Sequence, residues 1–147
     1  MVFRKLKFAA VFLFMFVGTK SVLAQLSADL VVIGNEIGSN SLSKKQTLLY
    51  AKGESNFWPN GKKVVIALPS QKSELAATVA TNIYKTTVNG MQKYWLSLVF
   101  QGRVDPPFFF ASDEEIIRFV QNNKGAIGFI HVKNKSKAAD LVIEVKD

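Results

Sequence analysis

The sequence predicts an α/β domain whose mixed sheet is covered by helices on both faces. Its short β-branched runs are continuous rather than alternating, which is typical of strands buried on both sides. Between these runs, apolar residues recur at helical spacing, so strands and helices alternate along the chain. The 147 residues contain no internal repeat and no low-complexity segment. One compact domain is therefore expected.

Four strands are predicted from the apolar runs. The run DLVVIG ends at a glycine, and the run KVVIAL follows WPNG, in which proline and Asn-Gly favour a turn. The predicted strands are residues 29–34, 63–68, 126–130 and 140–145. The segment KNKSKAAD is charged, and we expect it to be a loop.

Two capping boxes predict the starts of helices. Ser43 followed by Gln46 opens a helix that is expected to end toward Gly53. Ser112 followed by Glu115 opens another, whose apolar residues point to one face.

Two more helices are predicted in the middle of the chain. An apolar stripe over residues 75–84 has Ser70 or Ser73 in front of it as the N-cap. A second stripe over residues 91–99 ends at Gly102.

Two glycines stand in the apolar stretch NNKGAIGFI. Gly125 follows a helical pattern, where a glycine can adopt the left-handed conformation that ends a helix. Gly128 lies inside a predicted strand, where glycine marks a bulge or the close approach of another backbone or a ligand.

The N-terminal segment has the pattern of a secretory signal. Basic residues precede a ten-residue apolar run, Phe8 to Val17, and small residues surround Ala24. The run is too short to cross a hydrocarbon core of about 30 Å as a helix. We expect a cleaved signal over residues 1–24 and a domain over residues 25–147, with no transmembrane segment after cleavage. A retained amphipathic anchor is the alternative.

Charge and cysteine content narrow the class of protein. The formal net charge is +8, and four of the basic residues lie in the predicted signal, which leaves about +4 for the domain. Its lysines are dispersed, without the clustered arginines and aromatics of a nucleic-acid groove. The chain has no cysteine, which excludes disulfides and thiol chemistry and, in an exported chain, is compatible with a periplasm.

No motif predicts catalysis, a metal or another cofactor. His131 is the only histidine, and a lone histidine at the end of a strand is most often structural. Asp113, Glu114 and Glu115 are interpreted as residues that favour the start of a helix rather than as paired catalytic carboxylates. No nucleophile elbow and no glycine-rich nucleotide loop occurs.

The order of the motifs resembles a known family. The segments LVVIGN, LSKKQTLLYAKGESNFWPNGKKVVIAL, YWLSLVFQGRVDPP and SDEEIIRFVQNNKGAIGFI are similar to those of small phosphate ABC transporter substrate-binding-like proteins. The resemblance implies a single-lobe type II periplasmic-binding-protein fold and a phosphate-like oxyanion as ligand. It also implies that Gly128 packs near a cleft. Full-length relatives have two lobes, and this chain supplies about one.

The resemblance and the physics of helix ends together suggest an anion site after the second strand. The family's Gly-Ser-Gly-Thr loop is absent, and residues 69–74 read PSQKSE in its place. Ser70 and Ser73 can donate to an oxyanion at the positive end of a helix, and Lys72 adds charge. Asn35, which follows the first strand, is a further candidate for the same cleft. The alternative is that the serines only cap a helix and that Asn35 only forms a turn.

The segment PPFFF has two interpretations. Three consecutive phenylalanines in an extended segment cannot all face inward, so at least one is expected to be exposed. The segment is either a buried linker strand or a contact surface for a partner or a second copy.

Two functions are compatible with the sequence. The first is a periplasmic, non-catalytic solute-binding module for phosphate or a similar oxyanion, which would act with a membrane transporter. The second is a ligand-free binding-protein fold that serves as a sensory or interaction subunit for a membrane partner.

Overall fold

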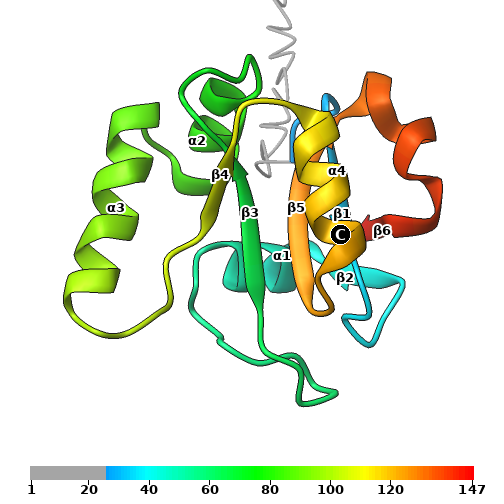
Figure 1. Ribbon diagram of the computed structural model, residues 1–147, viewed down its shortest axis with the longest axis horizontal. Coiled ribbons are helices and arrows are strands. Elements are labelled where there is room, and N and C mark those ends of the chain that lie inside the picture. Colours follow the sequence, from blue (N-terminus) through cyan, green and yellow to red (C-terminus); the bar gives the residue numbers. More distant parts are fainter. Residues whose placement is uncertain (1–25) are drawn as a thin grey trace, which may run out of the picture.

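The computed structural model describes residues 26–147, so the predicted signal over residues 1–24 lies outside the described residues. A six-stranded mixed sheet has helices on both faces, which confirms the predicted fold class (Figure 1). The strands are β1 (Leu30–Gly34), β2 (Ser41–Ser43), β3 (Val65–Pro69), β4 (Phe108–Phe110), β5 (Ala126–His131) and β6 (Val142–Lys146). The helices are α1 (Lys44–Ala51), α2 (Ala76–Tyr84), α3 (Val88–Phe100), α4 (Asp113–Asn122) and the 3₁₀ helix η1 (Val132–Leu141).

The directions of the strands define two edges of the sheet. The strand order is β2-β6-β1-β5-β3-β4. β3 runs parallel to β4 and β5, whereas β1 runs antiparallel to β5 and β6. The C-terminal ends of β3, β4 and β5 therefore share one edge, which we call the upper edge because it lies at the top of Figure 1. The end of β1 lies at the opposite, lower edge, beside the starts of β3 and β5.

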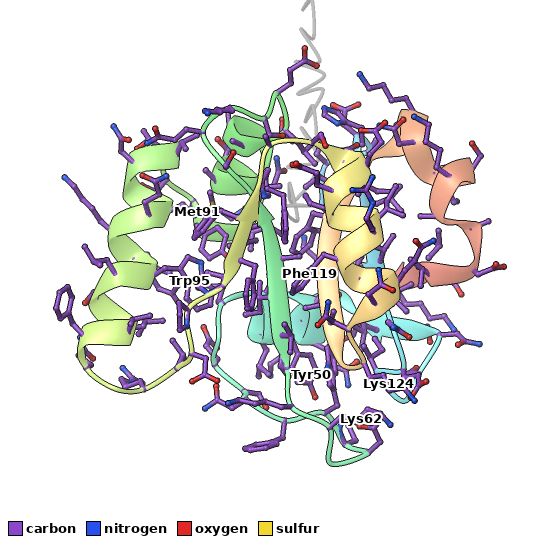
Figure 2. The ribbon with its side chains drawn as sticks, viewed as in Figure 1. Tyr50, Lys62, Met91, Trp95, Phe119 and Lys124 are labelled. Atoms are coloured by element: carbon purple, nitrogen blue, oxygen red, sulfur yellow. The ribbon has the colours of Figure 1, made fainter. Side chains whose placement is uncertain are left out.

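Alternating side chains of the strands form two cores. Val32, Leu68 and Phe129 face α1, α2 and α3, and Met91 and Trp95 of α3 point back toward the sheet (Figure 2). The opposite face packs on α4, which lies in front of β5 in Figure 1. Its core consists of Val31, Ile33, Ala67, Ile116, Ile117, Val120, Ala126, Ile130 and Ala138. Burial on both faces explains why the strands lack polar alternation.

The helix boundaries agree with two predictions and correct a third. Ser43 and Ser112 each form the predicted capping box. The prediction that Ser70 or Ser73 is the N-cap of the following helix is wrong, because α2 begins after Leu75, which makes no side-chain cap. A turn comes between β3 and α2, and the Ser73 hydroxyl accepts a hydrogen bond from Leu75 N within it.

Two short elements differ from the prediction. The segment predicted as a charged loop forms η1, in which Ala138 is 2% exposed and packs into the core beneath α4. β2 was not predicted, because its three residues are too few to show a periodic pattern. Among the described residues, no helix is both long and apolar enough to cross a membrane.

The two glycines of the stretch 122–130 have different structural roles. Gly125 has a φ of +84°, which confirms the left-handed conformation, and a Cβ there would collide with the carbonyl oxygen of Lys63. A Cβ on Gly128 would lie 2.8 Å from Cγ2 of Ile116 and 3.2 Å from Cγ2 of Val120. The close approach at Gly128 is therefore that of α4. The expectation of a neighbouring cleft is wrong, since core side chains surround this glycine.

The three phenylalanines form the edge strand β4. Phe108 is 51% exposed and Phe109 is 38% exposed, so the interpretation as a buried strand is wrong and the expected exposure is confirmed. The rings of Phe108 and Phe110 lie on the α4 face, with centroids 4.8 Å and 5.0 Å from that of Phe119. An apolar strip thus runs along the open side of the sheet.

Candidate anion-binding site

The turn between β3 and α2 lies at the upper edge and leaves several donors without partners. Ser70 N donates to the Phe110 carbonyl at 2.7 Å, which ties the turn to β4, and Ser73 N donates to the Ser70 carbonyl at 2.9 Å. Within residues 26–147, no hydrogen bond uses the N–H groups of Gln71, Lys72 or Glu74 or the hydroxyl of Ser70. Unpaired N–H groups before a helix favour the binding of an anion.

Two hollows flank this turn. One, of about 480 Å³, is lined by Ser70, Gln71, Lys72, Gln92, Phe109, Phe110, Ala111 and Glu115. The other, of about 470 Å³, is lined by Lys72, Ser73, Glu74, Ala111, Ser112, Asp113, Glu114, His131, Lys133, Asn134 and Lys137. We call the second the histidine hollow. The turn brings Ser70, Lys72 and Ser73 together, but the two serines line different hollows, and of these three residues Lys72 alone lines both.

Several polar side chains that line the first hollow already have hydrogen-bond partners within the chain. Gln71 Nε2 donates to Oδ1 of Asn89 at 3.1 Å and to Oε1 of Gln92 at 2.9 Å, which links the turn to α3. The Glu115 carboxylate accepts from Ala111 N and Ser112 N. Its negative charge is therefore satisfied by the start of its own helix.

A buried carboxylate organises the histidine hollow. Asp113, the first residue of α4, is 5% exposed, and its Oδ2 accepts from His131 N and from Nδ2 of Asn134, both at 2.8 Å. The same oxygen lies 3.1 Å from Nδ1 of His131. Because a carboxylate oxygen accepts, this contact assigns the proton of the neutral imidazole to Nδ1. Asp113 thus also orients the His131 ring.

Two of the three lysines around the histidine hollow lie beside carboxylates. Lys137 Nζ lies 2.8 Å from Glu114 Oε1, and this hydrogen bond lowers the pKa of Glu114. Lys133 Nζ lies 3.9 Å from Glu74 Oε2. Three lysines and three carboxylates line the hollow, and the lysines on η1 each have a carboxylate nearby. Among residues 26–147, no group of three or more histidine, aspartate or glutamate side chains is placed to hold a metal ion.

Asn35 lies at the lower edge, away from the turn after β3. Its Nδ2 donates to the carbonyl oxygens of Val120 at 2.9 Å and Gln121 at 3.1 Å, so the side chain caps the end of α4. The carboxyl ends of two strands lie at the same edge of a sheet only when the strands are parallel. β1 is antiparallel to β5, so its carboxyl end lies opposite to those of β3 and β5. The structure therefore does not bring Asn35 together with Ser70, Lys72 and Ser73.

Sequence reasoning missed the pairing of His131 with Asp113. His131 ends β5 and Asp113 begins α4, and each was interpreted separately, as a structural histidine and as a residue that favours a helix start. The available signal was that a strand end and a helix start can meet at the same edge of an α/β sheet.

The fold is similar to part of several solved structures. PstS from Borrelia burgdorferi matches with a TM-score of 0.61 and 13% identity over 81% of this chain and 47% of that protein. A possible phosphate binding protein from Planctomyces limnophilus matches with a TM-score of 0.58 and 12% identity, over 81% and 42%. An ABC-type phosphate transport receptor from Vibrio cholerae matches with a TM-score of 0.51 and 17% identity, over 80% and 46%.

These likenesses show the fold and not a particular activity. The chain spans less than half the length of each of the three proteins. No protein-family model matches the sequence, and no curated protein does.

Proposed function

We propose that this chain is a periplasmic, non-catalytic solute-binding module that binds phosphate or a similar small oxyanion at the upper edge of its sheet. The observation that supports this proposal most strongly is the set of unpaired N–H groups at Gln71, Lys72 and Glu74. The similarity in fold to proteins described as phosphate-binding or as a phosphate transport receptor is a second support. The periplasmic location rests on the signal predicted over residues 1–24.

The turn supplies the chemistry that an oxyanion requires. The start of α2 carries a partial positive charge, the Ser70 hydroxyl and the main-chain N–H groups can donate, and Lys72 adds a full charge. Glu74 is exposed beside them and opposes an anion. The described residues form one lobe, so the turn holds an anion from one side of the site only. We therefore expect weak binding, in the millimolar to micromolar range.

Anion titrations of the turn variants test the proposal. Replacement of both serines, Ser70→Ala with Ser73→Ala, should weaken phosphate binding at the turn, because it removes one hydroxyl donor from each of the two hollows. It should cost about 1 kcal/mol of stability, because the hydrogen bond from Leu75 N to Ser73 is lost. Lys72→Gln should weaken binding and reduce its salt dependence with little effect on folding. The measurements are isothermal titration calorimetry and thermal shift with phosphate and sulfate.

A matched control removes the same charge elsewhere. Lys45 is exposed on α1, far from the turn in sequence and fold, and Lys45→Gln should leave anion affinity unchanged. The proposal is refuted if the wild type binds no oxyanion at millimolar concentration, or if affinity is the same in the wild type and in the turn variants.

The exposed edge strand favours a second candidate function, a ligand-free interaction or sensory subunit. Phe108 and Phe109 expose apolar surface beside an edge strand that has no partner on one side. Such a surface suits contact with a membrane transporter or sensor. Under this function, oxyanions leave the melting temperature unchanged, so the same titrations decide between the two candidates.

A further inference from the structure

We infer that His131 is an anion ligand in the histidine hollow, and that the binding of a small oxyanion there is linked to the uptake of a proton by His131. This inference rests on the proposed function and deepens it, because it adds a residue outside the turn of Ser70 to Glu74. From its place at the end of a predicted strand, His131 is expected only to be structural.

The contacts of His131 leave one ring nitrogen available to a ligand. Both its main-chain N–H and its Nδ1 face Oδ2 of buried Asp113, so the orientation of the ring is held from two points. The side chain is 23% exposed and lines the hollow. Within residues 26–147, no hydrogen bond is made by Nε2.

The protonation state of His131 decides whether Nε2 attracts or repels an anion. In the neutral ring the proton lies on Nδ1 toward Asp113, so Nε2 is a bare acceptor that cannot form a hydrogen bond with an oxyanion oxygen that carries no proton, such as those of sulfate. In the charged ring Nε2 carries a proton and can donate a charge-assisted hydrogen bond. Histidine is the side chain whose charge ordinarily changes between about pH 5 and 8.

The other charges that face the ring balance one another. The turn contributes Lys72 and Glu74, α4 contributes Asp113 and Glu114, and η1 contributes Lys133 and Lys137. On the neighbouring strand, Leu30 pairs with His131. Asp29, the residue immediately before Leu30, carries a carboxylate that accepts a hydrogen bond from the Ser27 hydroxyl at 3.4 Å. The hollow itself is neutral when His131 is neutral and becomes positive when His131 takes up a proton. An anion that favours the positive state must in turn favour protonation.

The remaining lining suits a small, tetrahedral oxyanion. Hydroxyls of Ser73 and Ser112 and the amide of Asn134 border the hollow beside His131. A volume of about 470 Å³ has room for an anion together with several waters of about 30 Å³ each. Because the hollow is open and polar, we expect an inorganic anion such as phosphate or sulfate rather than an apolar ligand.

Proton NMR of the single histidine tests the inference without any substitution. His131 is the only histidine of the chain, so the imidazole signals of the untagged protein belong to it. We expect the midpoint of its pH titration to rise when phosphate or sulfate is added, compared with chloride at the same ionic strength. A rise by about one pH unit corresponds to tenfold tighter anion binding to the protonated form.

Calorimetry of a matched pair of variants gives the second readout. His131→Gln keeps an amide that can donate to Asp113 and carries no charge, so its sulfate affinity should be the same at about pH 5.5 and about pH 8. Lys124→Gln removes one charge at the lower edge and should keep the wild-type pH dependence, with about tenfold tighter sulfate binding at the lower pH. Circular dichroism and thermal melting confirm that each variant is folded.

The outcomes separate this inference from the proposed function. If phosphate or sulfate binds but leaves the His131 midpoint unmoved, and His131→Gln binds as the wild type does, the inference is wrong and the proposed function stands. If neither anion binds at any pH, both are wrong. If the midpoint rises and His131→Gln loses the pH dependence, His131 is an anion ligand.

Discussion

The lower and upper edges of the sheet carry similar polar residues but differ in how those residues are bonded. At the lower edge, the Asn35 amide caps α4, and Trp58 Nε1 donates to the Gly125 carbonyl at 2.8 Å. Glu36 lies 3.2 Å from Lys62 and 3.1 Å from Lys124, which are close together in Figure 2. At the upper edge, the turn after β3 leaves N–H groups unpaired within the described chain.

Hydrogen-bond partners, rather than residue types, therefore separate the bonded lower edge from the upper edge, which has donors to spare. Asn35 and Ser70 both follow a buried strand, and both were candidates for an anion site. Asn35 has no donor left, because both of its amide hydrogens have carbonyl partners. The hydroxyl of Ser70 and the N–H groups beside it still need an acceptor, which water or an anion can supply.

The largest expected effect comes from breaking the lower edge at Gly125. Gly125→Ala should destabilise the protein by about 3 kcal/mol, because it combines a left-handed conformation with a collision against the Lys63 carbonyl. Gly61→Ala is the control, since Gly61 has a φ of +83° and no atom within 4 Å of an added Cβ. It should cost about 1–2 kcal/mol. Urea denaturation measures both, and equal losses would contradict the role of the close contact.

A smaller effect is expected from Asn35, whose side chain tests whether the lower edge is purely structural. Asn35→Ala should cost about 1 kcal/mol, because the last carbonyls of α4 lose the two hydrogen bonds from its amide. Anion affinity should not change, since Asn35 lies at the opposite edge from Ser70 and Ser73. Urea denaturation and phosphate titration measure the two quantities. A loss of affinity without a loss of stability would return Asn35 to the binding site.

The smallest effect is expected from Glu36, whose ion pairs are exposed. Hydrogen bonds from Lys124 and then Lys62 lower the pKa of Glu36 below its ordinary value of 4.5. The pairs therefore stabilise the folded state fully above that pH, and the stabilisation disappears as pH falls through the lowered pKa. Melting curves of the wild type and Glu36→Gln should differ slightly at neutral pH and converge in acid. If the difference in melting temperature between the two proteins grew as the pH fell, the ion pairs of Glu36 would not be the source of the stabilisation.

Local signals were sufficient for most of the elements. The capping boxes at Ser43 and Ser112 depend on residues only three positions apart. The core strands depend on continuous apolar runs. In both cases the neighbouring residues alone are enough to predict the element. The start of α2 was placed too early, because Ser73 bonds within a turn that precedes the helix. The burial of β4 was misjudged, because its place at the edge of the sheet depends on pairing with β3, which no local pattern records.

The candidate site was predictable only in part. Ser70, Lys72 and Ser73 are neighbours in sequence, so their grouping required only that a turn follows the strand. The exclusion of Asn35 required the direction of β1 relative to β5, and the pairing of Asp113 with His131 required the packing of α4 on the sheet. Both depend on contacts between distant segments, which the spacing of residues does not reveal.

The position of β1 in the centre of the sheet also determines how the chain can fold. β1 is the first strand of the described chain, yet it pairs only with β5 and β6, which lie near the end of the sequence. The central ladder therefore forms only after a long loop has closed, and proteins rich in such distant contacts fold slowly. While a ribosome extends the chain, β1 remains without its partners until β5 has been made. We therefore expect the sheet to assemble only once β5 and β6 have been synthesised, so β1 stays open to other partners, such as a chaperone, while most of the described chain is being made.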